Sequence, residues 1–436
     1  MADPDDQVMA RAADAEDARD AYALDDSLRM QLRARVAAED VAGIDALMAP
    51  LHPADIADLL EQVSDAERAA WLGLCSAGID GEVLSELDWG LREEVIGLLP
   101  DEVLADAVRD LDSDDVVDLV EDLEDAQQAA ILGALTPTGR VAVEQALAYP
   151  EDSAGRLMQR EVVHAPEHWS VGEMIDYLRA HKRDLPEQFY HVVLTDPRMK
   201  PTGHVTLGRL LSTARKTPLA EIGEESFRTI PATQHEADVA YAFNQYHLIS
   251  APVVDEDGRL VGVITIDDAM IALDRTNQED LLRLAGVGEE SRLSDRIVET
   301  TRQRFPWLFV NLITAILASL VIAQFEDAIV QIVALAVLMP IVASMGGNAG
   351  TQSLTVAVRA LATKDLTRSN LMRVITREAA VGLINGLVFA VVMGVIGLVW
   401  FSSPALGAVI AAAMVINLLV AGLAGILIPV VLERLK

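Results

Sequence analysis

Cysteine and basic residues are both scarce in this 436-residue chain. Its single cysteine, Cys75, excludes a disulfide framework within the chain, so nothing indicates an oxidising compartment. The 34 lysines and arginines face 67 aspartates and glutamates, which gives a formal net charge of -33. Such a charge repels phosphates and excludes nucleic acid as a partner. It suits divalent cations as partners or, as the simpler alternative, plain solubility.

The acidic and the apolar residues lie in different halves of the sequence. Almost all the acid precedes residue 300, and the long apolar runs follow residue 305. The first thirty residues lack the apolar core of a signal peptide. We therefore expect residues 1–27 to form an acidic, disordered tail and the front half to stay in the cytosol.

Four long apolar runs after Trp307 predict four transmembrane helices. We expect a transmembrane domain over residues 305–436, with spans near 307–325, 328–362, 379–401 and 405–432. Basic residues precede the first span, link the second to the third and follow the fourth. Basic links face the cytoplasm. The sequence thus predicts a multi-pass protein of the cell inner membrane, in contact with lipid, with cytoplasmic N-terminal domains.

The second span contains an unusually polar stretch from Pro340 to Thr355. Its proline and glycines predict a loosened backbone, which a membrane tolerates only beside protein or a water-filled cavity. Neutral oxygens there suit a hydrated hard cation such as Mg²⁺. The alternative is helix packing through small residues, with polar groups joining the helices. The candidate pore residues are Gly346, Gly347, Asn348, Thr351, Gln352 and Thr355. Glu378, at the start of the third span, is either a vestibule acid or a local partner of Arg377.

An internal repeat with an offset of 60 residues runs through the region 28–150. Leu51 to Leu60 matches Leu111 to Val120, and residues 65–73 match residues 125–133. Stacked repeats of amphipathic helices predict an α-helical superhelix domain. In the last copy, Asp114 and Asp118 lie four residues apart and share one helical face. Either a divalent ion or plain solvation would relieve their repulsion.

Strands and helices alternate from residue 151 to residue 275. In the clearest unit, residues 253–254 form a strand, Asp257 and Gly258 turn the chain, and residues 260–264 form the hairpin partner. A weaker copy ends near Leu211. Two such copies resemble a pair of cystathionine-β-synthase-type (CBS) modules, which form a cleft for adenosine nucleotides such as ATP.

The nucleotide motif of that module is met once in this chain. The resemblance implies that Thr265 and Asp268 contact the ribose, whereas the weaker copy has Thr206 but Arg209 in place of the acid. The pair therefore holds one nucleotide site or none. A charged linker helix is expected to follow over residues 276–304.

The expected fold class is thus multi-domain: an α-helical superhelix domain, an α/β CBS pair, a linker helix and an α-helical transmembrane bundle. This order, together with Pro-x-x-x-x-Met-Gly-Gly-Asn-x-Gly-x-Gln-Ser from Pro340 to Ser353, resembles MgtE magnesium transporters along nearly the whole chain. Residues 153–158 and 304–307 are similar to the proteobacterial branch. The sequence has no nucleophile elbow, phosphate-binding glycine loop or zinc spacing, so we expect no enzyme.

The resemblance implies a homodimer that passes Mg²⁺ selectively through a pore on its two-fold axis. It also implies a gate held shut by cytosolic Mg²⁺ bound between the helical domain, the CBS pair and the linker helix. The regulatory ligands that it implies are Glu82, Asp114, Asp118, Asp268, Glu279 and Asp280.

The family resemblance is incomplete at the C-terminus. The family has five spans, the fifth with an intramembrane aspartate at the pore centre, and this sequence shows four. We expect a truncated sequence, with a natural four-span variant as the alternative. The rival function is a membrane-tethered nucleotide or ion sensor, or a non-conducting truncated transporter.

Overall fold

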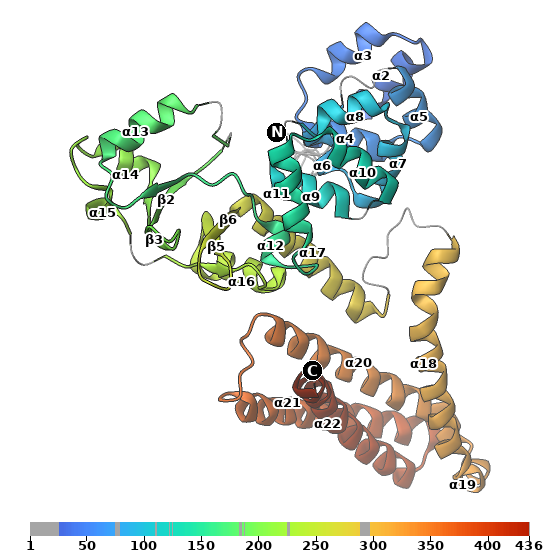
Figure 1. The fold of residues 1–436 in the computed structure, drawn as a ribbon. Coiled ribbons are helices and arrows are strands. Elements are labelled where there is room, and N and C mark those ends of the chain that lie inside the picture. Colours follow the sequence, from blue (N-terminus) through green and yellow to red (C-terminus); the bar gives the residue numbers. More distant parts are fainter. Residues whose placement is uncertain are drawn as a thin grey trace, which may run out of the picture. The chain divides into compact units, whose positions relative to one another are not determined.

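The computed structural model describes residues 26–74, 79–109, 111–121, 123, 125–182, 185–186, 188–224, 227–287 and 297–435. The expected tail therefore lies outside the described residues up to position 25, as do residues 288–296 of the expected linker. The chain forms two compact units, Met1–Thr276 and Asn277–Lys436. Figure 1 gives the element labels used below.

Short helices build the N-terminal part of the first unit. They are α2 (Asp26–Ala37), α3 (Val41–Met48), α4 (Pro53–Gln62), α5 (Asp65–Leu74), α6 (Gly81–Glu86), α7 (Trp89–Leu98), α8 (Asp101–Ala107), α9 (Ser113–Glu121), α10 (Asp125–Ala134) and α11 (Pro137–Leu147). Each amphipathic helix turns its apolar face inward, and the buried side chains form one continuous core around Trp71, Leu84 and Leu119. Side-chain caps such as Asp80 on α6 fix where several helices begin.

The 60-residue repeat of the sequence recurs as equivalent contacts in the structure. In the first copy, Arg68 Nε donates to the Leu60 carbonyl at 3.0 Å. In the second copy, Gln128 Nε2 donates to the Val120 carbonyl at 2.7 Å. The two carbonyls, of Leu60 and Val120, are equivalent positions near the ends of α4 and α9. The pairs α4–α5 and α9–α10 are therefore two copies of one helical hairpin.

The CBS pair follows as two small sheets of the same topology. Its elements are α12 (Ala154–Leu157), β1 (His164–Pro166), α13 (Val171–Ala180), β2 (His191–Thr195), β3 (Pro201–Thr206), α14 (Leu207–Ser212), α15 (Leu219–Ile222), β4 (Ile230–Pro231), α16 (Glu236–Tyr246), β5 (Ser250–Val254), β6 (Leu260–Thr265) and α17 (Ile266–Ala285). In each sheet the first strand runs parallel to the second, and the second pairs antiparallel with the third. The expected hairpin is confirmed, with Gly258 at a φ of +77° that suits glycine.

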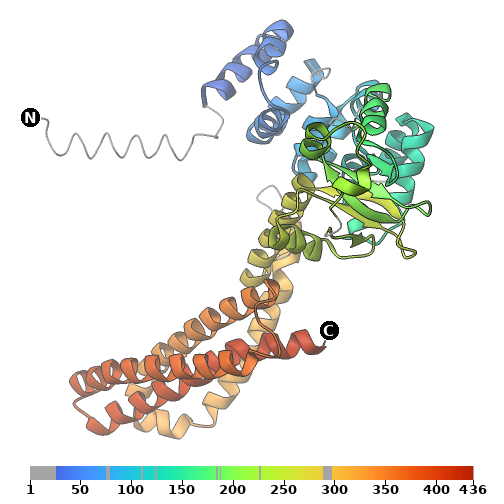
Figure 2. The same ribbon diagram turned by 90° about the vertical axis from the view of Figure 1, so that its left-hand side faces the viewer.

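The second unit contains the long apolar helices. They are α18 (Ile297–Ala323), α19 (Glu326–Gln331), α20 (Ala334–Ala362), α21 (Leu371–Phe401) and α22 (Pro404–Leu435). In the described chain, α18 and α20 to α22 are long and apolar enough to cross a membrane. Helix α22 packs against both α20 and α21, and the three run side by side in Figure 2.

The fold class predicted from the sequence is confirmed, but two details of the prediction are wrong. The expected second span over residues 328–362 divides into α19 and α20, with a break at Ile332. Helix α20 is continuous through Pro340 and the glycines that were expected to loosen it. Proline removes only one backbone donor, which costs one hydrogen bond to the carbonyl four residues earlier. Gly346 instead allows close packing, because an added Cβ there would collide with the Asn417 side chain of α22.

Candidate functional site

Aspartates from α9 and α17 face one another where the helical domain meets the CBS pair. The acids that act most strongly on Asp114 are Asp268, Asp115 and Asp112. Those that act most strongly on Asp115 are Asp268, Asp112 and Asp118. We call this group the aspartate cluster; its members are Asp112, Asp114, Asp115, Asp118, Asp267 and Asp268.

Burial and mutual repulsion raise the pKa values of three members of the aspartate cluster. Burial first, and then repulsion from Asp268, raises the pKa of Asp114 well above its usual range. The same two causes raise the pKa of Asp115 to about 7. Burial also raises the pKa of Asp268 to about 6, although a hydrogen bond from Thr265 opposes the shift. Ionisation of these carboxyl groups is therefore costly, so the cluster favours a bound proton or a cation.

Polar contacts close the interface around the aspartate cluster. Ser113 Oγ donates to Glu161 Oε2 at 2.8 Å, and the Arg160 backbone N–H donates to the same Ser113 oxygen at 2.9 Å. Gln159 Nε2 donates to Asp112 Oδ2 at 2.5 Å. These bonds tie the start of α9 to the chain that enters the CBS pair, and they hold the carboxylates together against their repulsion.

Asp118 differs from its neighbours because two arginines contact it. Arg92 Nη1 lies 2.7 Å from one carboxylate oxygen, and Arg275 Nη2 lies 3.4 Å from the other. In the described part of the chain, no salt bridge reaches Asp114 or Asp115. Asp118 therefore has its charge balanced by protein, whereas Asp114 and Asp115 do not.

A cation is the natural complement of such carboxylates. Among the residues that the structure describes, no three His, Cys, Asp or Glu side chains converge closely enough to ligate one ion directly. Mg²⁺ holds its water shell tightly and is often bound through only one or two carboxylates. The cluster thus fits a hydrated divalent ion better than one stripped of water.

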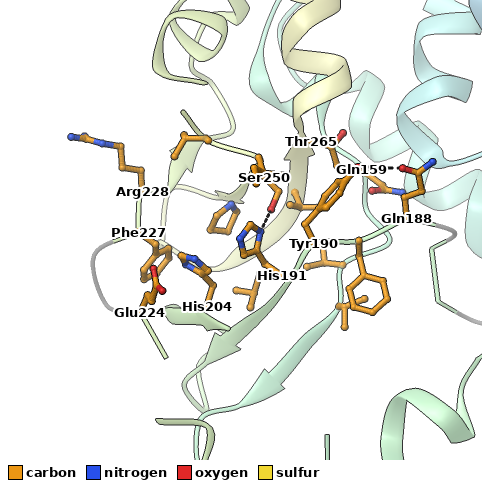
Figure 3. A pocket seen from close by; sticks show the side chains of 18 of the residues that line it. Gln159, Gln188, Tyr190, His191, His204, Glu224, Phe227, Arg228, Ser250 and Thr265 are labelled. Atoms are coloured by element: carbon orange, nitrogen blue, oxygen red, sulfur yellow. Dashed lines mark hydrogen bonds between the residues drawn. The ribbon is translucent and has the colours of Figure 1, made fainter. Parts of the chain in front are cut away.

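A cavity of about 370 Å³ lies between the two CBS modules. Figure 3 shows His191, His204 and Phe227 on one side of this cavity and Tyr190 and Gln188 on the other. The rings of His191 and His204 meet edge to face with centroids 4.6 Å apart. His191 Nδ1 lies 2.6 Å from Ser250 Oγ. Aromatic faces and hydrogen-bonding groups of this kind suit a heterocyclic ring.

The charges of the cavity are few. Burial lowers the pKa values of both His191 and His204, so their rings are neutral at pH 7. Arg228 lies over the Tyr246 ring, 3.5 Å from its centroid, and both residues line the cavity. An arginine held in this way presents a fixed cation to an anionic group of a ligand.

Helix α20 carries two different faces over the polar stretch. Gly346, Gly350 and Ser353 lie against α22, where a Cβ added to Gly346 would collide with the Asn417 side chain. The other face is exposed, and we call it the oxygen stripe; it comprises Gly347, Asn348, Thr351, Gln352 and Thr355. Thr351 and Thr355 each donate to the carbonyl four residues earlier, at 3.0 Å. Their hydroxyl oxygens therefore present lone pairs outward.

Comparisons with known proteins match the parts of the chain that hold the aspartate cluster, the cavity and the oxygen stripe. The MgtE model, described as a divalent cation transporter, matches residues 339–436. The MgtE intracellular N domain matches residues 51–152, and the CBS domain matches residues 219–275. The magnesium transporter MgtE of Thermus thermophilus is 29% identical over 418 residues, which cover 94% of this chain and 92% of that protein.

A second relative and a solved structure agree. The magnesium transporter MgtE of Bacillus subtilis is 27% identical over 386 residues, which cover 88% of this chain and 85% of that protein. The chain belongs to the MgtE family. The crystal structure of the cytosolic domain of the Mg²⁺ channel MgtE in complex with ATP is 28% identical, with a TM-score of 0.51. That match covers 56% of this MgtE-family chain and 99% of the solved chain.

The structure brings together only some of the residues that the sequence suggested as ligands in this MgtE-family chain. Asp114, Asp118 and Asp268 meet in the aspartate cluster. Glu82 is exposed in the first turn of α6. Glu279, which pairs with Arg283 at 3.2 Å, and Asp280 lie in the second unit.

Some of the nucleotide and pore candidates lie at the expected sites, and others lie elsewhere. Thr265 lines the cavity, whereas Asp268 accepts the Thr265 hydroxyl at 2.7 Å and belongs to the aspartate cluster. Gly346 lies on the packed face of α20 rather than on the oxygen stripe. Glu378 accepts a hydrogen bond from Ser353, and no ion pair with Arg377 occurs in the described chain.

Sequence reasoning missed Asp112 and Asp115. The signal was present, because a run of three acids (Asp112, Asp114 and Asp115) opens α9. A spacing of four residues selected Asp114 and Asp118 for one helical face. The opposing charge of Asp268, which comes from a distant part of the chain, decides which of them are repelled.

Proposed function

We propose that this chain forms a Mg²⁺-selective channel or transporter of the inner membrane, and that it works as a homodimer. The oxygen stripe on α20 carries the proposal, since it sets out neutral oxygens along an exposed face of a spanning helix. Hydroxyl and amide oxygens can replace or contact the water shell of a hard cation. A second copy of the stripe across a two-fold axis would enclose such a path.

Reconstitution tests this function. The purified protein is placed in liposomes that contain a Mg²⁺-sensitive dye, and uptake is followed under a membrane potential. We expect uptake by the unmodified protein and a loss of at least about ten-fold in Asn348→Leu, because an apolar side chain cannot hydrate the ion. Val356→Leu is the matched control, since Val356 is 62% exposed but apolar. Absence of uptake by the unmodified protein would leave a sensor without transport.

We further propose that cytosolic Mg²⁺ regulates the protein by binding at the aspartate cluster. A bound cation relieves the repulsion among Asp114, Asp115 and Asp268, so it favours contact between the helical domain and the CBS pair. Removal of the ion restores the repulsion and weakens that contact. Helix α17 begins at the cluster, and it continues past Thr276 to Ala285 without a break.

The third part of the proposal is a nucleotide in the CBS cavity. The support is the ring-lined cavity with Arg228 at its side, and the likeness to a cytosolic domain solved in complex with ATP. We expect Arg228→Ala to weaken ATP binding about ten-fold in calorimetry, because a charge-assisted bond to phosphate is lost. Arg259→Ala is the control, since in the described part of the chain the Arg259 guanidinium pairs with the nearby surface acid Asp257. We infer no enzymatic step in this transport.

A further inference from the structure

Two hydrogen bonds between helices bracket the oxygen stripe of α20. Asn417 Nδ2, from α22, donates to the Val342 carbonyl at 2.6 Å. Ser353 Oγ donates to the carboxylate of Glu378 on α21. The two anchor points on α20 are eleven residues apart, which is about three turns or 16 Å of helix. The stripe lies between them or within one turn of them.

Ser353 uses its hydroxyl differently from its neighbours. Thr351 and Thr355 donate to carbonyls of their own helix. Ser353 is 5% exposed and donates across to another helix. A hydroxyl in a helix normally has the local carbonyl available. The bond to Glu378 therefore takes the place of a local bond and joins α20 to α21.

The remaining contacts on this side of α20 are close but not directional. A Cβ added to Gly425 would lie 2.6 Å from the Gly350 carbonyl and 2.7 Å from Ser353 Cβ. Contact between glycines brings backbones together but allows the helices to rotate and slide. Directional polar bonds are needed to select one rotation.

Glu378 is a partly buried acid inside a candidate span, and among the described residues it forms no ion pair. An acid within a spanning helix is costly, and by default it suggests a functional site. Its oxygen faces Ser353 and the small residue Gly422, where a Cβ would sit 3.8 Å away. Ser353 is on the packed face of α20, so Glu378 reaches the stripe only through that helix.

We propose that Glu378 is a positioning residue: by accepting the Ser353 hydroxyl, it sets the rotation of α20 and so aims the oxygen stripe. Its link to ion selectivity rests on the proposed transport function. The orientation itself does not, and it can be measured without any flux.

Thiol labelling of the full-length protein in membranes tests this. Cys75, the single native cysteine, is replaced by serine, and single cysteines are placed at Thr355 on the stripe and at the neighbouring Val356. A membrane-impermeant thiol reagent then reports which position faces water. We expect Glu378→Ala to change the ratio of the two labelling rates by at least about three-fold, the size expected for one lost bond between membrane helices. Glu378→Gln keeps an acceptor oxygen and should keep most of the original ratio.

A double-mutant comparison decides whether the two residues act as a unit. Ser353→Ala should reproduce the effect of Glu378→Ala, and the double variant should add nothing further. In liposomes, the same variants should change the ratio of Mg²⁺ to Co²⁺ uptake, a readout that general loss of folded protein does not move. An unchanged labelling ratio in Glu378→Ala, or independent effects of the two substitutions, would overturn the proposal. Absence of flux in the unmodified protein refutes only the transport function.

Discussion

Thr265 and Asp268 join the cavity between the CBS modules to the aspartate cluster. Thr265 lines the cavity, and its hydroxyl donates to Asp268 Oδ2 at 2.7 Å. In the first CBS module, the equivalent Thr206 instead accepts from the Arg209 backbone N–H at 3.3 Å and only caps its helix. The two modules share a topology, but one of them alone uses this threonine to hold an acid.

Thr265→Val should therefore weaken Mg²⁺ binding. The substitution removes a bond that lowers the pKa of Asp268, so the carboxylate holds its proton more tightly and competes less well for the ion. Limited proteolysis across a Mg²⁺ titration measures this, because bound Mg²⁺ should protect residues 275–287 from cleavage. We expect the Mg²⁺ concentration that gives half of the protection to rise a few-fold, which corresponds to a loss of about 1 kcal/mol of binding free energy. Thr206→Val is the control and should leave that midpoint unchanged.

Asp115→Asn should make the domain contact less dependent on Mg²⁺. Removal of one buried, repelled charge stabilises the contact in the absence of the ion, by on the order of 1 kcal/mol. Hydrogen exchange at the amides of α9, measured with and without a chelator, reports the change. Asp58→Asn is the matched control, because Asp58 is exposed in the other copy of the repeat. Equal effects of the two variants would show that Asp115 is simply solvated.

The acid pKa values predict a pH dependence with a definite sign. The pKa of Asp115 is about 7 and that of Asp268 about 6. Both exceed the ordinary aspartate value of about 4. The state in which the helical domain contacts the CBS pair therefore binds protons more tightly than the separated state, and the contact loses stability as the pH rises between about 4 and 7. Without divalent cations, we expect α9 amides to be better protected at about pH 5.5 than at about pH 7.5, after correction for intrinsic exchange. Saturating Mg²⁺ should flatten the difference.

Sequence periodicity was sufficient for the architecture and for part of the site. The repeat, the hairpin around Gly258 and the apolar spans depend on local patterns, and the structure has each of them. The sequence did not distinguish the packed face of α20 from its exposed face. The glycine-rich motif contains residues of both faces, such as the packed Gly346 and the exposed Gly347.

Long-range contacts explain what sequence reasoning missed. The partner of Gly346 is Asn417 on another helix, and the group that repels Asp115 is Asp268 in another domain. Arg275, which contacts Asp118, likewise comes from a distant position. No spacing rule within one helix reports such neighbours.

The adjacent glycines Gly346 and Gly347 should respond in opposite ways to enlargement. Gly346→Val would drive a side chain into Asn417, which is held on the Val342 carbonyl, so it should destabilise the helix pair by roughly 1–3 kcal/mol. Gly347 has nothing within 4 Å of an added Cβ. Gly347→Val should leave thermal stability in detergent unchanged and reduce Mg²⁺ uptake, because it adds an apolar group to the stripe. Similar stability losses in both variants would contradict the division of α20 into two faces.

Helix α17 carries Asp267 and Asp268 in its first turn and ends at Ala285. Its 20 residues span about 30 Å, so a tilt of about 5° at the first turn displaces the far end by between 2 and 3 Å, roughly half of one helical pitch. A tilt of this size would convert a shift of a few tenths of an ångström at Asp268 into a displacement of between about 2 and 3 Å at Ala285.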